Sequence, residues 1–308
     1  KPVCTTHVPR ANLLYSPRNK ILATSLLIEA FLYEEQTRRG ISFKHFDEFN
    51  DVADHCTVCH KCLSPCPVDI DYGDVSIAMR NFLREQNKKH FNPGTLMAMT
   101  YLNLKDPLTI KIMRKFMVDI GYKFQRWGHS LFKKIGLVNF SKKSPKSTVG
   151  KSSISTQVIH FMNRPMPKEM PTKTSRGLLG IEDDKVIPVI RNIDKIDENS
   201  EAVFYFPGCG SERLFSQVGL ATQAMLYKVG AITVLPPGYL CCGYPQTSSG
   251  DHDKGQEITS DNRVQFHRVA NTLNYLDIKT VIVSCGTCMD QLQKYEFEKI
   301  FPGCRLLD

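Results

Sequence analysis

Three common signatures are missing from this sequence of 308 residues. No hydrophobic run approaches the length of a membrane-spanning helix. No nucleic-acid recognition motif accompanies the basic residues, and no serine–histidine–acid or paired-carboxylate arrangement stands out. Acidic side chains are fewer than basic ones, 31 against 40, which leaves a formal net charge of +9. We therefore predict no membrane span, no nucleic-acid partner and no catalytic side chain, but an acidic partner or a membrane surface.

Cysteine, in contrast, is plentiful. The chain has eleven cysteines, an odd number, and most are grouped at the spacings of metal ligands. In a chain of this length, such grouping favours reduced thiolates that hold metal over a secreted disulfide framework. No signal peptide is evident at the start, but a truncated chain could have lost one, so the compartment is inferred from the cysteines. Because reduced thiolates persist in the cytosol, we predict a cytoplasmic protein.

Four cysteines stand close together, at Cys56, Cys59, Cys62 and Cys66, and Pro67 follows the last of them. The run C-x2-C-x2-C-x3-C-P is the ligand pattern of bacterial ferredoxins, in which three thiolates of one loop bind a single 4Fe-4S cluster. In two-cluster ferredoxins the fourth cysteine ligates the other cluster. The alternatives are a zinc knuckle and a chance group of buried thiols, although zinc sites usually separate two C-x-x-C pairs by a longer insert.

Cys4 is the nearest candidate for the remaining ligand of this cluster. If another cysteine stood four residues before it, Cys4 would be the last ligand of a first ferredoxin motif whose other members are cut away. We therefore predict that these residues belong to a longer polypeptide with a truncated first motif. Cys4 would complete the cluster of the loop, and Cys66 would lack a cluster of its own. The alternative is a lone thiol in a frayed terminus.

Helical periodicity predicts an α-helical, ferredoxin-like domain over residues 1–135. We expect helices at 17–39, 47–54, 72–88 and 108–135, and another that begins near Pro93. The last of these combines many basic residues with an apolar stripe made of Met113, Phe116, Met117, Ile120, Phe124, Trp127 and Leu131. Such a helix can lie in a membrane interface, but we favour an apolar face turned to the core with a solvated basic side. Peripheral membrane contact is the second interpretation.

The rest of the chain divides into a linker and a second domain. Residues 136–200 are rich in Lys, Ser, Thr and Pro, so we predict an extended linker. Residues 201–308 alternate strands at 202–206, 231–235 and 280–283 with helices at 214–229 and 254–276. This order predicts an α/β domain with a parallel, doubly wound sheet, whose ligands bind beyond the carboxyl ends of the strands.

Five further cysteines follow these three strands, at Cys209, Cys241, Cys242, Cys285 and Cys288. Because adjacent side chains diverge, the vicinal pair is awkward for one tetrahedral ion but suits a cluster of several irons. A structural zinc site and a redox-active dithiol at Cys285-x-x-Cys288 are the competing interpretations. Cys304 lies outside this spacing pattern.

These residues carry a family resemblance. Cys209, Cys241-Cys242-Gly243 and Cys285-x-x-Cys288 resemble the cysteine-rich CCG domain. With the ferredoxin motif, the chain resembles iron-sulfur subunits of the glycolate oxidase, lactate utilisation and anaerobic glycerol-3-phosphate dehydrogenase type. Ser16-Pro17-Arg18-Asn19-Lys20-Ile21 is similar to a Ser-Pro-Arg-Gly-Arg-Ile stretch of those subunits. The chain most resembles the carboxyl-terminal part of bacterial FAD-linked oxidase fusions, although a second CCG repeat is missing.

The resemblance implies a role in electron transfer. An FAD on a separate domain or subunit would oxidise a 2-hydroxy acid of the lactate or glycolate type. The iron-sulfur module would then relay the electrons to a quinone or another acceptor. Related domains of heterodisulfide reductase hold a noncubane iron-sulfur cluster at the five CCG cysteines, so a thiol or disulfide reductase is the alternative function. A metal-stapled interaction domain is a third.

Overall fold

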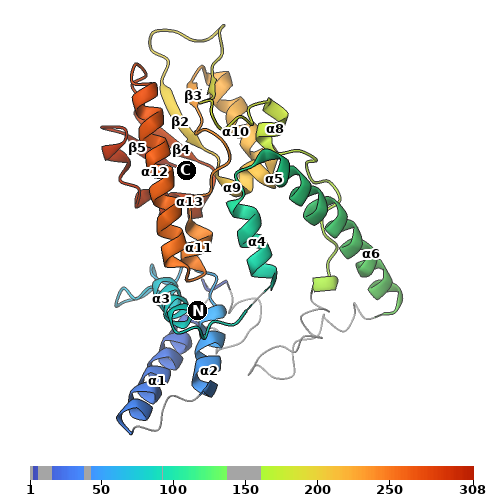
Figure 1. The fold of residues 1–308 in the computed structure, drawn as a ribbon, viewed down its shortest axis with the longest axis vertical. Helices are drawn as coiled ribbons and strands as arrows, with labels where there is room; N and C mark the ends of the chain where they lie inside the picture. Colours follow the sequence, from blue (N-terminus) through green and yellow to red (C-terminus); the bar gives the residue numbers. More distant parts are fainter. Residues whose placement is uncertain (1–2, 6–15, 38–42, 92, 137–160) are drawn as a thin grey trace. The chain divides into compact units, whose positions relative to one another are not determined.

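The computed structural model describes residues 3–5, 16–37, 43–91, 93–136 and 161–308. The chain forms two compact units, and several segments distant in sequence contribute to each. Unit 1 contains Lys1–Asn92, Arg126–Pro165 and Gln246–His252, and unit 2 contains Pro93–Gln125, Met166–Pro245 and Asp253–Asp308. Figure 1 shows the helices and strands of the chain, coloured along the sequence.

Three helices form the core of unit 1 (Figure 1). Helix α1 (Pro17–Gln36) begins with a proline, whose missing N–H would have no partner in the first turn of a helix. Helix α3 (Tyr72–Glu85) begins after Asp71, whose carboxylate caps the helix by accepting from the Gly73 amide. With α2 (Phe43–Asp54), they bury Leu27, Phe46, Phe49, Ala53, Tyr72, Met79 and Leu83. The three helices expected around the cysteine loop are confirmed, with one end of each shifted by three or four residues.

Unit 2 is built on a mixed sheet of five strands, in the order β1-β3-β2-β4-β5. Strands β2 (Ala202–Phe206), β3 (Ile232–Val234), β4 (Thr280–Val283) and β5 (Arg305–Leu307) run parallel to one another. The buried runs of apolar residues in β2 and β4 are typical of strands covered on both faces. The parallel core agrees with the sequence, while the doubly wound arrangement stays a prediction.

The edge strand β1 (Val189–Ile190) makes the sheet mixed, whereas the sequence predicted a wholly parallel one. It pairs antiparallel with β3, where Val189 faces Val234 and Ile190 faces Thr233. It lies in the stretch expected to be linker, as does the short helix α8 (Ser175–Leu179). A strand of two residues leaves no periodic signal, so only its pairing with β3 reveals it.

The remaining helices of unit 2 follow the strands. They are α9 (Gly208–Arg213) and α10 (Ser216–Val229) after β2, α11 (Tyr244–Ser248) and α12 (His252–Thr272) after β3, and α13 (Gly286–Gln293) with the 3₁₀ turn η5 (Phe297–Lys299) after β4. Part of α11 and the first residue of α12 belong to unit 1. The carboxyl ends of β2, β3 and β4 therefore all lead into loops or short helices that carry cysteine.

Helix α4 (Pro93–Asn103) is followed by one longer helical stretch, in which α5 (Pro107–Arg114), the π-helical turn η3 (Lys115–Ile120) and α6 (Gly121–Lys134) succeed one another. Its buried side carries Ile110, Arg114 and Val118, and the Arg114 Nε donates to the carbonyl of Arg213. Two members of the expected stripe, Met113 and Met117, pack against the buried cluster of Tyr101, Ile110 and Tyr239, as predicted. The other five are not turned to the core. With Leu108 and Ile112 they form an exposed stripe, in which the side chains of Leu108, Ile112, Phe116, Ile120, Phe124, Trp127 and Leu131 are 39–68% exposed. Within the described residues, no helix is both long and apolar enough to cross a membrane.

Aromatic packing between α12 and the sheet predicts a large effect of one substitution. Phe266 is fully buried and its ring contacts those of Phe204, Phe206 and Tyr295. We expect Phe266→Ala to lower the free energy of unfolding of unit 2 by about 3–5 kcal/mol, because it leaves a cavity among rings. Val264→Ala on the same helix, at a side chain 68% exposed, is the matched control. Equal denaturant midpoints for the two variants would contradict this packing.

Candidate metal centres

In unit 1, Cys4, Cys56, Cys59 and Cys62 line one cavity. Cys4 is buried, and 52 residues separate it from the nearest cysteine of the loop. The neighbouring Thr5 ties this segment to the loop, since its Oγ1 lies 2.7 Å from the Oγ1 of Thr57 and 3.7 Å from the Cys59 Sγ. The structure thus brings Cys4 to three cysteines of the loop.

The backbone of this loop turns its amide groups toward sulfur. Val58 and His60 adopt left-handed conformations, with φ of 49° and 54°, which are uncommon for residues other than glycine. The Val58 amide donates to the Cys56 Sγ at 3.3 Å. Amide donors of this kind stabilise negative charge on a ligand sulfur, so the strained turn is consistent with a thiolate site.

Cys66 does not line the cavity that the other four cysteines share. Its Sγ instead accepts a hydrogen bond from the Ile70 amide at 3.3 Å. The structure therefore separates Cys66 from Cys4, Cys56, Cys59 and Cys62, the division that the sequence predicted.

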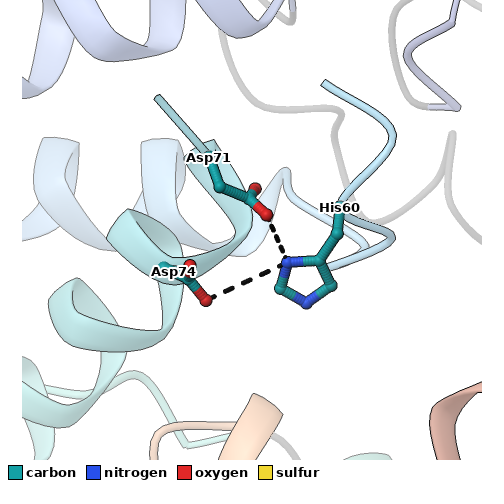
Figure 2. Close-up of side chains that lie close together, drawn as sticks. All are labelled: His60, Asp71 and Asp74. Atoms are coloured by element: carbon teal, nitrogen blue, oxygen red, sulfur yellow. Dashed lines mark hydrogen bonds and ion pairs between the residues drawn. The ribbon is translucent and has the colours of Figure 1, made fainter. Parts of the chain in front are cut away.

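His60 and two aspartates form a polar group beside the loop (Figure 2). The His60 Nδ1 lies 2.6 Å from Asp71 Oδ2 and 3.9 Å from Asp74 Oδ1. The other oxygen of Asp71 accepts from the Gly73 amide at 2.6 Å and from the Cys62 thiol at 3.5 Å. The His60 side chain is only 28% exposed, and it is paired with Asp71. A Cβ at Gly73 would lie 2.7 Å from the His60 Nδ1, so this contact requires glycine.

In unit 2, the five cysteines predicted to form the second site are a chain of neighbouring thiols. The Cys241 Sγ lies 3.9 Å from the Cys209 Sγ. Cys241 also interacts with Cys242, Cys242 with Cys288, and Cys288 with Cys285. All five follow the carboxyl ends of β2, β3 and β4, where ligands of parallel sheets bind. A Cβ at Gly208, which has a φ of +73°, would lie 2.8 Å from the Cys288 Sγ.

Two buried side chains hold the vicinal pair in place. The Asn262 amide donates to the Cys241 carbonyl at 2.7 Å, and the Tyr295 hydroxyl donates to the Cys242 carbonyl at 2.9 Å. Asn262 also donates to the Tyr295 oxygen at 3.0 Å. Neither residue was a candidate from sequence, because a hydrogen bond to a backbone carbonyl leaves no motif.

Hydrogen bonds between these thiols lower the pKa of some and raise the pKa of others. The thiol of Cys241 lowers the pKa of Cys242 to about 5, and that of Cys288 lowers the pKa of Cys285 to about 4. The same contacts raise the pKa values of their partners, as for Cys288 beside Cys242. The hydrogen bond with Cys241 raises the pKa of Cys209, and the charge of buried Arg213 opposes that rise. Two of the thiols are therefore readily available as thiolates.

The separation of the sulfurs tests which metal the cysteines fit. Four thiolates on one zinc ion, with bonds of about 2.3 Å, would have sulfurs about 3.8 Å apart. Among the described cysteines, no three have sulfurs that all lie within 4.8 Å of one another. Neither group therefore has three sulfurs already gathered around one point, whereas several irons bridged by sulfide can reach thiolates that stand farther apart. The donor sets fit iron-sulfur clusters.

Residues 203–293 match the family of cysteine-rich domains named CCG. The match begins in β2 and ends with α13, so it contains Cys209, Cys241, Cys242, Cys285 and Cys288 but not Cys304. No solved structure matches the chain significantly.

Three curated relatives extend the comparison beyond the CCG domain. The chain is 24% identical over 297 residues to the probable glycolate oxidase iron-sulfur subunit of Bacillus subtilis, which covers 96% of this chain and 56% of that protein. It is 28% identical over 93 residues to lactate utilization protein A of an Exiguobacterium species, covering 30% of this chain and 35% of that protein. It is 25% identical over 139 residues to an uncharacterized iron-sulfur protein of Methanococcus maripaludis, covering 45% of this chain and 24% of that protein. The chain thus spans little more than half the length of these relatives at most.

The cavity in unit 1 predicts that replacing Cys4 and replacing Cys66 have different effects on metal content. In protein purified without oxygen, Cys4→Ser should lower iron and sulfide content as much as Cys59→Ser does, because both thiols line the cavity. Cys66→Ser should retain the metal content of the unmodified chain. Metal analysis with absorption spectra makes the comparison, and a Cys4→Ser chain with full iron content would remove Cys4 from the ligand set.

Proposed function

We propose that this chain is the iron-sulfur electron-transfer module of a flavin-linked 2-hydroxyacid dehydrogenase. Residues 1–135 would bind a 4Fe-4S cluster through Cys4, Cys56, Cys59 and Cys62, and residues 201–308 would bind a second cluster at the CCG cysteines. The FAD would lie on a separate domain or subunit, and a quinone or another acceptor would receive the electrons. The observation that carries the proposal is the convergence of Cys4 on the cavity lined by the ferredoxin cysteines.

Two further findings support this function. The relatives named glycolate oxidase iron-sulfur subunit and lactate utilization protein A link similar chains to the oxidation of small 2-hydroxy acids. In addition, all of these thiols except the exposed Cys59 are partly or fully buried, and burial is one of the factors that set the potential of a cluster. Iron-sulfur clusters bound there would supply one-electron transfer.

The residues of the chain would position these groups and tune them. The Val58 amide stabilises charge on Cys56, and Asn262 and Tyr295 fix the backbone of the vicinal cysteines. The polar group of His60 and Asp71 stands next to Cys62 and orders the end of the loop. None of these groups needs to transfer a proton for electrons to pass.

A thiol or disulfide reductase is the second candidate, and one observation favours it. Cys285 precedes helix α13 and Cys288 lies in its first turn, and the contact with Cys288 lowers the pKa of Cys285 to about 4. A helix start with an acidic thiol is also found in dithiol oxidoreductases. Reduction of a disulfide by the dithionite-reduced protein, with no reduction of a quinone analogue, would select this function.

We also propose that the exposed stripe on α5, η3 and α6 rests on an anionic membrane surface. Its large apolar side chains would enter the interface, and the exposed Lys111, Lys115, Lys123, Lys133 and Lys134 along the same stretch would meet lipid headgroups. Asp119 is the one acidic residue between Pro107 and Lys134. Such contact would bring a lipid-soluble quinone close to the protein.

An electron relay that ends at the CCG cluster predicts which reaction step is lost when a CCG ligand is removed. In the intact protein with its flavin partner, Cys242→Ser should leave flavin reduction by the 2-hydroxy acid unchanged and reduce turnover with the acceptor by at least about a hundredfold, because a ligand of the last cluster is lost. Cys304→Ser is the control, since Cys304 lies outside the CCG group. Stopped-flow flavin absorbance and steady-state acceptor reduction separate the two steps. Unimpaired turnover of Cys242→Ser would reduce the CCG site to a structural role.

The exposed stripe predicts binding to vesicles. Phe124→Ala combined with Trp127→Ala should lower partitioning onto vesicles of phosphatidylglycerol and phosphatidylcholine by at least about tenfold, because two aromatic side chains no longer enter the interface. Binding should also weaken at high salt and on pure phosphatidylcholine. Tyr275→Ala, at a side chain 74% exposed, is the control. Cosedimentation that is equal for all variants would exclude this surface.

A further inference from the structure

Lys20 is a lysine in an unusual place. It lies in the first turns of α1, and its side chain is almost completely buried, with 2% exposure. Lysine is rarely buried to this extent unless the charge has a use or a partner. Its Nζ donates to the carbonyl of His55 at 2.6 Å and stands 5.5 Å from the centre of the Tyr72 ring.

The surroundings of Lys20 are the four cysteines of unit 1. Lys20 lines the same cavity as Cys4, Cys56, Cys59 and Cys62. The carbonyl that it binds belongs to the residue just before Cys56. Burial lowers the pKa of Lys20, and negative charge on these four cysteines raises it. The cation and the thiolates are thus placed to stabilise one another.

A buried cation has a definite effect on a neighbouring redox group. A cluster with four thiolates is an anion, and reduction adds one more negative charge. A fixed positive charge in a medium of low dielectric stabilises the reduced form more than the oxidised form. The amide donors of the loop act in the same direction, but each carries only a partial charge.

We propose that Lys20 raises the reduction potential of the cluster held by Cys4, Cys56, Cys59 and Cys62. The inference rests on the proposed function, because it requires a cluster in this cavity. Lys20 is a positioning and tuning residue, since it acts on the cluster through charge and is not a ligand. It makes this cluster a better acceptor for electrons from a flavin than the thiolates alone would allow.

The experiment compares variants that separate charge from structure. Lys20→Arg keeps the charge, Lys20→Gln keeps a hydrogen-bond donor for the His55 carbonyl, and Lys20→Met keeps neither. Lys89→Met is the matched control, because Lys89 is also partly buried in unit 1 but pairs with Asp54. Each protein is purified without oxygen, its iron and sulfide are measured, and its cubane EPR signal is followed in a redox titration.

We expect all five proteins, including the unmodified chain, to contain the same amount of iron. Lys20→Gln and Lys20→Met should lower the equilibrium constant for reduction by on the order of tenfold, a shift of about 59 mV to more negative potential for one electron. Lys20→Arg and Lys89→Met should titrate close to the unmodified chain. A purely structural role would change the iron content and not the potential.

Different results overturn different statements. An unmodified chain without iron and sulfide would refute the proposed function itself. A chain that holds its cluster, with an unchanged potential in Lys20→Gln or Lys20→Met, would refute the tuning role alone. Loss of the cluster from both neutral variants would also overturn it, because Lys20 would then be needed to build the loop.

Discussion

The gathering of several thiolates in buried space is the constraint on which most of this structure depends. Sulfur anions repel one another and lose their hydration when they are buried, so the chain must supply opposing charge. Unit 1 does so with the Val58 amide and the buried ammonium of Lys20. Unit 2 does so with Arg213, which is 1% exposed and donates to the carbonyls of Tyr101 and Leu102. Each group of cysteines thus has at least one buried cation anchored to backbone oxygen, and in unit 1 the buried Arg80 also donates to the Cys56 carbonyl.

The two units assemble their thiols by different routes. In unit 1 one short loop carries three cysteines, and a segment about fifty residues earlier adds Cys4. In unit 2 three parallel strands end at the same edge, and the residues after each strand contribute one or two cysteines. The first arrangement needs strained backbone to fold around its cavity, while the second takes its geometry from the sheet. Side chains that bind only backbone, such as Asn262, complete the second site.

The sequence predicted the features whose signal is local. Helices α1 and α3, strands β2 and β4, and both groups of cysteines follow from periodicity and spacing. The convergence of Cys4 was predictable because the ferredoxin pattern demands a distant fourth ligand. Strand β1, the burial of Lys20 and the pairing of His60 with Asp71 depend on residues far apart in sequence, so no local pattern contains them. The stripe on α5, η3 and α6 was predicted correctly only for Met113 and Met117, because apolar residues at helical spacing do not say whether they face core or solvent.

The π-helical turn η3 explains how the exposed stripe keeps its direction. Leu108, Ile112, Phe116, Ile120 and Phe124 are spaced by four residues. In an α-helix each such step advances about 400°, so the row drifts by about 40° and winds around the axis. A π-helix has more residues in each turn, about 4.4, and the same step there falls short of a full turn. The π-helical turn at Lys115–Ile120 therefore offsets, in the middle of the row, the rotation that the α-helical steps accumulate. Deleting one residue from it would restore regular winding and rotate the second half of the row by about 100°.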